Sequence, residues 1–95
     1  MKLLIAVVQD QDAGPLMQRL VDQGFGATKL ASTGGFLRQG NTTILIGLED
    51  AQVDAAVECI RRTCRHRRQA AAGAGDVEVG AATIFVLRVD RFERI

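Results

Sequence analysis

The order of short apolar strands and amphipathic helices constrains the fold of this 95-residue chain most strongly. Short runs rich in β-branched residues predict strands, and apolar residues at helical spacing predict two helices. The strands are expected at residues 2–8, 27–32, 42–48, 77–79 and 82–89. Gly80 is expected to bend the chain within the last, interrupted strand. The resulting order, β-α-β-β-α-β, predicts an α+β fold, a ferredoxin-like βαββαβ sandwich.

Residues that commonly cap or stop helices mark the ends of both helices. Asp10 and Asp12 stand where an N-cap belongs, and Pro15 fits the first turn of a helix that Asp12 would open. Gly24 is expected to end this first helix as the residue after its C-cap. Asp50 is expected to cap the second helix.

Basic residues are concentrated after the second helical pattern. The chain has a net charge of +1, yet residues 61–68 contain five arginines and no acidic residue. These arginines are expected in the last helical turn, where cations suit the helix dipole, although such a run can also bind phosphate. Residues 69–75 are rich in Ala and Gly and predict a loop. Aromatic residues make up 4% of the chain, all of them Phe, so a nucleic-acid partner is not predicted.

The strand expected at residues 42–48 is apolar on both of its faces. Ile44 and Ile46 alternate with Leu45 and Gly47. Two helices can cover only one face of the sheet, and a domain this small buries only about 60–65% of its unfolded surface. The sequence therefore predicts an oligomer in which the second faces of the sheets meet.

Several classes of protein are excluded by what the chain lacks. The apolar run at residues 3–8 is too short for a signal peptide or a membrane span. Cys59 and Cys64 form neither a CxxC pair nor a disulfide framework, and Cys64 with His66 offers too few ligands for zinc. We expect one cytoplasmic domain over residues 1–95, without a metal, a cofactor or membrane insertion.

The glycine-rich stretch from residue 28 to residue 43 carries the chemistry that the sequence best supports. It has the glycine spacing of a phosphate-binding P-loop, but Asn41 and Thr42 replace the Lys-Ser/Thr pair, and the segment joins two strands. It is therefore not a Walker motif. Its backbone amides, with Lys29 and Arg38 close by, could nevertheless hold phosphate oxygens.

Two interpretations of the apolar residues in this loop remain open. Phe36 could stack on a nucleotide base. Alternatively, Gly34 and Gly35 form a hairpin turn, and Phe36 and Leu37 pack into the core. Gly47, inside the following strand, marks either a bulge or a place where a ligand approaches the backbone closely.

No arrangement of residues predicts catalysis. His66 is the single histidine and lies among arginines. Asp10 and Asp12 could act as an acid–base pair, but helix capping accounts for both. Ser32 and Thr33 have no identifiable base. The chain is therefore not expected to be an enzyme.

Three segments closely resemble the P-II-like cyclic di-AMP receptors of the nitrogen regulatory P-II superfamily. They are VVQDQD (Val7–Asp12), TKLASTGGFLRQGNTT (Thr28–Thr43) and VEVGAATIFVLRVDRF (Val77–Phe92). The resemblance implies a P-II-type homotrimer that binds cyclic di-AMP between subunits, has no catalytic activity and signals to an unidentified downstream protein. The ligand contacts that it implies are Thr28, Gly35, Phe36, Leu37, Asn41, Gly47 and Phe85.

The sequence departs from this family at two places. Gly26 stands where members often have an arginine placed toward the ligand phosphates, and the loop at residues 66–76 is short. A Gly26→Arg variant is expected to bind more tightly unless Lys29 or an arginine of residues 61–68 compensates.

Two other functions remain as alternatives. A P-II-like module could bind another adenine nucleotide, such as ATP, or none. Small βαββαβ domains also include acylphosphatase-like enzymes, but these place a phosphate-binding arginine in the first loop, and residues 9–14 contain no arginine.

Overall fold

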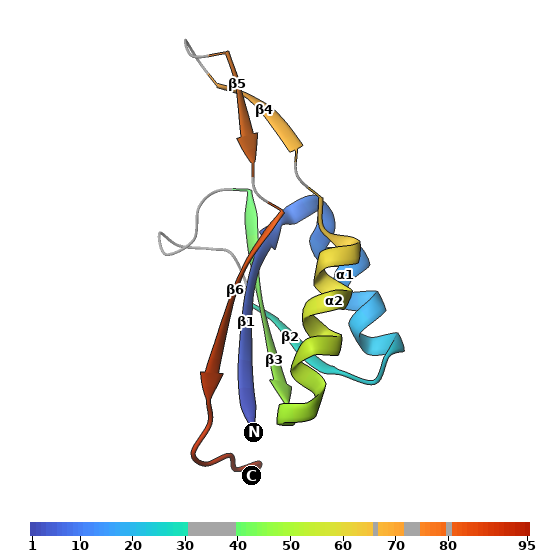
Figure 1. Ribbon diagram of the computed structural model, residues 1–95, viewed down its shortest axis with the longest axis vertical. Coiled ribbons are helices and arrows are strands. Elements are labelled where there is room, and N and C mark those ends of the chain that lie inside the picture. Colours follow the sequence, from blue (N-terminus) through green and yellow to red (C-terminus); the bar gives the residue numbers. More distant parts are fainter. Residues whose placement is uncertain (31–39, 66, 72–74, 80) are drawn as a thin grey trace.

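A computed structural model of the chain describes residues 1–30, 40–65, 67–71, 75–79 and 81–95, without side chains at 67–71 and 75–79. Figure 1 shows its helices and strands. They are β1 Lys2–Gln9, α1 Asp10–Asp22, β2 Gly26–Leu30, β3 Asn41–Leu48, the 3₁₀ turn η1 Asp50–Gln52, α2 Val53–Thr63, β4 Arg67–Ala71, β5 Gly75–Val79 and β6 Ala82–Arg88.

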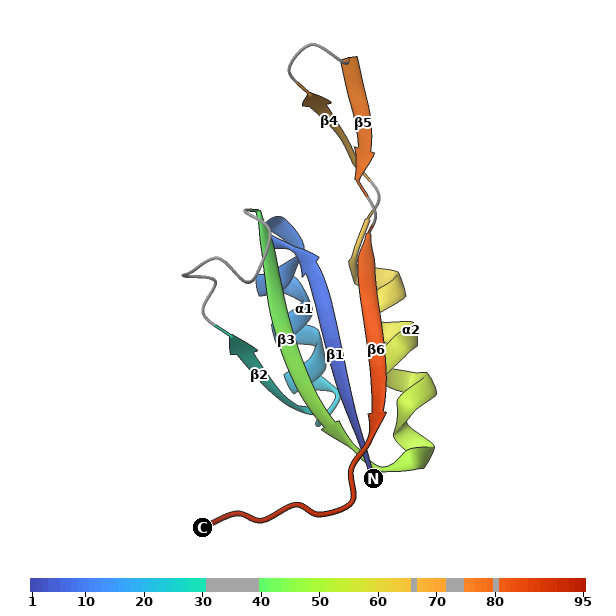
Figure 2. The ribbon, with the colours of Figure 1, turned by 90° about the vertical axis from the view of Figure 1, so that its left-hand side faces the viewer.

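The main sheet has four antiparallel strands in the order β2-β3-β1-β6. Both helices lie on one face of this sheet (Figures 1 and 2). This arrangement confirms the predicted ferredoxin-like fold, with β6 as its fourth strand.

The core lies between the helices and the face of the sheet toward them. Leu4 and Ala6 of β1 and Ile46 of β3 have no exposed surface, and Leu16 and Leu20 of α1 pack with them. Successive strand residues alternate between faces, so the residues between these point away from the helices. The alternation places residues 28, 45, 47 and 85 on the second face.

The first helix begins earlier than predicted. Its N-cap is Gln9, whose side chain makes no capping hydrogen bond within the described residues. The backbone amide of Asp10 instead donates to the carbonyl oxygen of Gly40 at 2.9 Å. The prediction that Asp10 and Asp12 cap this helix was therefore wrong. Pro15 lies inside the helix, beyond its first turn. Gly24 has φ of 85° after the C-cap, which confirms its predicted role.

The start of the second helix also differs. Glu49 and Gln52 form a reciprocal capping box at the 3₁₀ turn, so Asp50 is not the cap. The Asp50 carboxylate instead pairs with the Met1 ammonium at 3.1 Å and with Lys2 Nζ at 3.7 Å. Hydrogen bonding from that ammonium, together with the charge of Lys2, lowers the pKa of Asp50.

The arginine run leaves the second helix sooner than predicted. Arg61 and Arg62 lie in its last turn, but the helix ends at Thr63. Beyond it, the backbone of Arg65 is held from both sides: Gln9 Nε2 donates to its carbonyl oxygen at 2.9 Å, and its amide donates to Asp12 Oδ2 at 3.3 Å. These contacts fix the chain in an extended course away from the helix.

A second sheet covers part of the loop predicted at residues 69–75 and the strand predicted at residues 77–79. That strand pairs with β4 and not with the main sheet, so it is not the first half of β6 as predicted, and Gly80 lies outside the described residues. Strands β4 and β5 pair as an antiparallel hairpin, in register from Arg67↔Val79 to Ala71↔Gly75. The hairpin projects past the end of the main sheet in both views (Figures 1 and 2). Ala and Gly have low strand propensity, so the composition of this segment concealed its local pairing.

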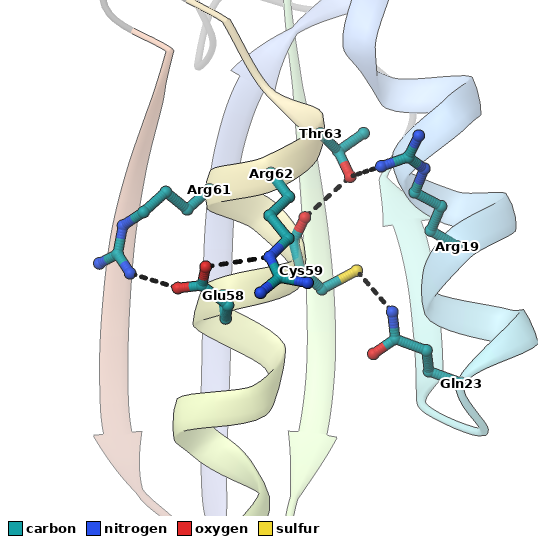
Figure 3. A network of polar contacts seen from close by, with 7 residues as sticks. All are labelled: Arg19, Gln23, Glu58, Cys59, Arg61, Arg62 and Thr63. Atoms are coloured by element: carbon teal, nitrogen blue, oxygen red, sulfur yellow. Dashed lines mark hydrogen bonds and ion pairs between the residues drawn. The ribbon is translucent and has the colours of Figure 1, made fainter.

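The two helices are joined by side-chain contacts (Figure 3). Arg19 donates to Thr63 Oγ1 at 3.4 Å, and Gln23 contacts Cys59 Sγ at 3.5 Å. Thr63 Oγ1 in turn donates to the carbonyl oxygen of Cys59 at 2.8 Å. None of the helices among the described residues is long and apolar enough to cross a membrane.

Candidate functional site

The sheet face away from the helices is open and largely apolar. Its central residues Ile5 and Leu45 are half-buried, whereas Phe85 and Leu87 on β6 are about half exposed, at 52% and 47%. Leu30 at the other edge is also exposed. The prediction that the strand at residues 42–48 is apolar on both faces is confirmed.

The strand registers arrange the open face in rows. Thr28 pairs with Leu45, Leu45 with Ile5, and Ile5 with Phe85, so one row crosses all four strands. The next row runs from Gly26 through Gly47 and Leu3 to Leu87. Two candidate ligand contacts, Thr28 and Phe85, therefore lie on the same face but at opposite edges of the sheet.

A hollow of about 450 Å³ opens where β2 and β3 meet the C-terminal segment. The residues that line it come from four places in the sequence: Met1, Leu3, Gly26, Ala27, Thr28, Leu45, Gly47, Val89, Phe92 and Arg94. It is a concave, mainly apolar surface with a few polar groups, as small-molecule sites usually are.

Two glycines lie opposite each other in this hollow. Gly26 and Gly47 are register partners on β2 and β3. A Cβ atom added at Gly47 would lie 4.0 Å from Met1 Cε, and one added at Gly26 would meet nothing within 4 Å in the described part of the chain. The backbone is thus open to close approach here, which is one of the two alternatives that the sequence left for Gly47.

The structure brings some of the candidate ligand contacts together and separates others. Thr28 and Gly47 line the hollow. Asn41 lies six residues from Gly47, at the other end of β3, or about 20 Å away at the rise of a strand. Phe85 lies three strand spacings from Thr28, roughly 14 Å. Gly35, Phe36 and Leu37 lie outside the described residues.

The end of β3 near Asn41 is fixed by polar contacts. Thr42 Oγ1 donates to Asp10 Oδ1 at 2.5 Å, which ties β3 to the start of α1. Thr43, on the open-face side of the strand, is buried, and its hydroxyl has no hydrogen-bond partner in the structure as described. The Thr42 hydroxyl thus makes a hydrogen bond that joins two elements of the fold, whereas the Thr43 hydroxyl makes none within the described residues.

Basic side chains are distributed unequally between the two faces. Arg61 and Arg62 contact Glu58 at 2.6 and 3.1 Å (Figure 3), and these hydrogen bonds lower the pKa of Glu58. Lys29 is the register partner of buried Ile44, so it belongs to the helix side of β2. Of the described residues that line the hollow, Arg94 is the basic one.

Sequence reasoning did not identify Phe92 or Arg94 as site residues. Their contribution depends on the path of the chain after β6, where the amide of Val89 donates to the carbonyl oxygen of Met1 at 3.1 Å. This contact holds the segment beside the start of β1. The signal available was an aromatic residue and an arginine directly after the last strand, which is too short a pattern to predict a site.

Known proteins are similar to this chain in sequence and in fold. A chain of the crystal structure titled as a functionally unknown protein from Pediococcus pentosaceus ATCC 25745 is 46% identical, with a TM-score of 0.77. The similarity covers 99% of the present chain and 96% of that one. The model of the cyclic-di-AMP receptor family matches residues 1–95, the whole chain. The chain therefore belongs to the cyclic-di-AMP receptor family.

Proposed function

We propose that this protein is a cytoplasmic, non-catalytic signalling protein that binds cyclic di-AMP at the subunit interfaces of a homotrimer. The observation that carries the proposal is the family match over residues 1–95. The hollow beside Gly26 and Gly47 supports it, because a nucleotide needs close access to backbone amides and an apolar surface for its bases.

The open sheet face supports assembly. The helices cover one face, and the other carries exposed large apolar side chains, including Leu30, Phe85 and Leu87. Exposed apolar surface of this kind commonly marks an interface between proteins. We infer that three copies bury these faces against one another.

The separation of the candidate contacts also supports binding between subunits. Phe85 lies too far from Thr28 and Gly47 in one chain for a single adenine ring to touch all three. A neighbouring copy can supply the missing aromatic residue. Thr28, Asn41 and Gly47, with Gly35, Phe36 and Leu37 of the loop, would then contact one ligand together with Phe85 of the adjacent subunit.

The test is a calorimetric titration with a panel of nucleotides. Cyclic di-AMP is expected to bind, with up to three ligands per trimer, and linear diadenylate and cyclic di-GMP more weakly. Binding of ATP alone would support the alternative of another adenine nucleotide, and binding of no nucleotide would overturn the proposal. Hydrolysis of an acyl phosphate would contradict the non-catalytic role.

A further inference from the structure

We propose that Asp10 positions Asn41 for cyclic di-AMP by holding the residue on each side of it. The proposal rests on the proposed function, in which Asn41 contacts the ligand. It gives Asp10, which does not cap its helix, the role of a positioning residue that acts on the ligand through Asn41 and does not touch it.

Two hydrogen bonds from Asp10 bracket Asn41. The backbone amide of Asp10 donates to the carbonyl oxygen of Gly40 at 2.9 Å. Its carboxylate oxygen Oδ1 accepts from Thr42 Oγ1 at 2.5 Å. Gly40 and Thr42 are the two sequence neighbours of Asn41. A single residue at the start of α1 therefore fixes the backbone on both sides of Asn41.

The contact with Thr42 lies behind the strand, on the side away from the ligand. Thr42 is buried and is the register partner of buried Val8, so it belongs to the helix side of β3. Because successive strand residues alternate between faces, Asn41 belongs to the open face, where it is half-buried. Asp10 can thus hold the strand in place while the open face stays accessible to a nucleotide.

Asn41 lies where the sheet itself restrains the chain least. It is the first residue of β3, and its register partner is the last residue of β1. On the other side, the pairing of β2 with β3 extends only as far as Leu30↔Thr43 among the described residues. Contacts from outside the sheet therefore determine how accurately Asn41 is placed, and Asp10 supplies two of them.

The function assigned to Asp10 is to accept a hydrogen bond and not to supply charge. A carboxylate near a ligand that carries two phosphates repels that ligand. Asp10→Asn keeps an oxygen that can accept from Thr42 and also keeps the backbone amide, but it removes the charge. It is therefore expected to bind cyclic di-AMP at least as tightly as the wild type, whereas Asp10→Ala loses the acceptor.

The experiment titrates cyclic di-AMP into the full-length wild type, Asp10→Ala, Asp10→Asn and Thr42→Val, with Asp22→Ala as the matched control. Asp22 is exposed at the other end of α1 and accepts from Gln18 Nε2 at 2.9 Å, so the control loses the same charge and a comparable hydrogen bond. Asp10→Ala and Thr42→Val are each expected to weaken binding about tenfold. The control is expected to bind as the wild type does.

The decisive variants also carry Asn41→Ala. If Asp10 acts through Asn41, then Asp10→Ala has no further effect on binding once the Asn41 side chain has been removed. A purely structural role would weaken binding by the same factor in both backgrounds. The melting temperature is measured alongside, and Asp10→Ala is expected to lower it equally with and without Asn41→Ala.

The possible failures are distinguishable. If the wild type binds cyclic di-AMP, the positioning role is overturned by any of three results, and the proposed function stands: undiminished binding by Asp10→Ala or by Asn41→Ala, equal weakening by Asp10→Ala in both backgrounds, or weakening by Asp10→Asn as large as by Asp10→Ala. If Asp10→Ala does not fold, Thr42→Val gives the same comparison, because it removes the same bond from the other side. If the wild type binds no cyclic di-AMP, the proposed function fails and this inference with it.

Discussion

Gly26 and Gly47 are opposite each other on neighbouring strands, and the absence of both side chains leaves the floor of the hollow as bare backbone. The two positions are 21 apart in the sequence numbering, with the glycine-rich loop between them. The pairing of β2 with β3 is what makes them one surface.

We expect Gly47→Val to weaken cyclic di-AMP binding about tenfold or more, since a side chain would occupy space that the ligand needs. The fold should tolerate the change, because an added Cβ would meet its nearest described neighbour at an ordinary contact distance of 4.0 Å. Calorimetry and thermal melting check both statements. Gly14→Ala, at an exposed position on α1, is the control and should leave binding unchanged. If Gly47→Val binds cyclic di-AMP as tightly as the wild type does, the ligand does not occupy the hollow.

Asn41→Ala and Phe36→Ala are each expected to weaken binding while the assembly stays intact. Loss of base stacking should cost roughly 1–3 kcal/mol, and loss of a buried amide partner about 1–3 kcal/mol. Titration and sedimentation of both variants are the measurements. If Phe36→Ala mainly lowers the melting temperature, Phe36 belongs to the core rather than to the ligand site.

Leu87→Glu is expected to dissociate the assembly, since it would bury a charge where the open sheet faces meet. Sedimentation at micromolar concentration should then give a monomer in place of a trimer. Val86→Glu is the matched control: Val86 has 44% exposure against 47% for Leu87, but it is the register partner of buried Leu4 and belongs to the other face. A wild type that sediments as a monomer, or equal effects of the two variants, would contradict this assembly.

Glu58→Gln is expected to lower the melting temperature at pH 7, because the ion pairs with Arg61 and Arg62 are lost. Those pairs lower the pKa of Glu58 in the folded state. Their contribution is therefore present above the unfolded pKa, about 4.3, and lost as the pH falls through the lower folded value. Melting curves of both proteins should converge toward pH 3. A constant difference down to that pH would show that ionisation of Glu58 is not the cause.

The fold could be predicted because its signals are local. Gly24 ends a helix through its own backbone conformation, and the alternation of Ile44 and Ile46 with Leu45 follows from strand geometry. The start of α1 was misjudged because the partner of the Asp10 amide is the Gly40 carbonyl, a contact that no local pattern contains.

The candidate site was predicted only in part for the same reason. Thr28 and Gly47 come together through strand pairing, which the predicted fold implies. Arg94 lines the hollow because the chain after β6 is held at Met1, where the Val89 amide donates to the Met1 carbonyl oxygen. No local pattern in the sequence predicts that contact.

The position of Met1 and Phe92 in the wall of the hollow has a practical consequence for work with this protein. Both ends of the described chain lie at the same end of the molecule (Figure 1), where the hollow opens. An affinity tag or a fluorescent fusion at either end would compete with small molecules for this space. A purification that leaves extra residues before Met1 or after Ile95 would then report an affinity lower than that of the untagged chain, and tag removal before titration is the appropriate design.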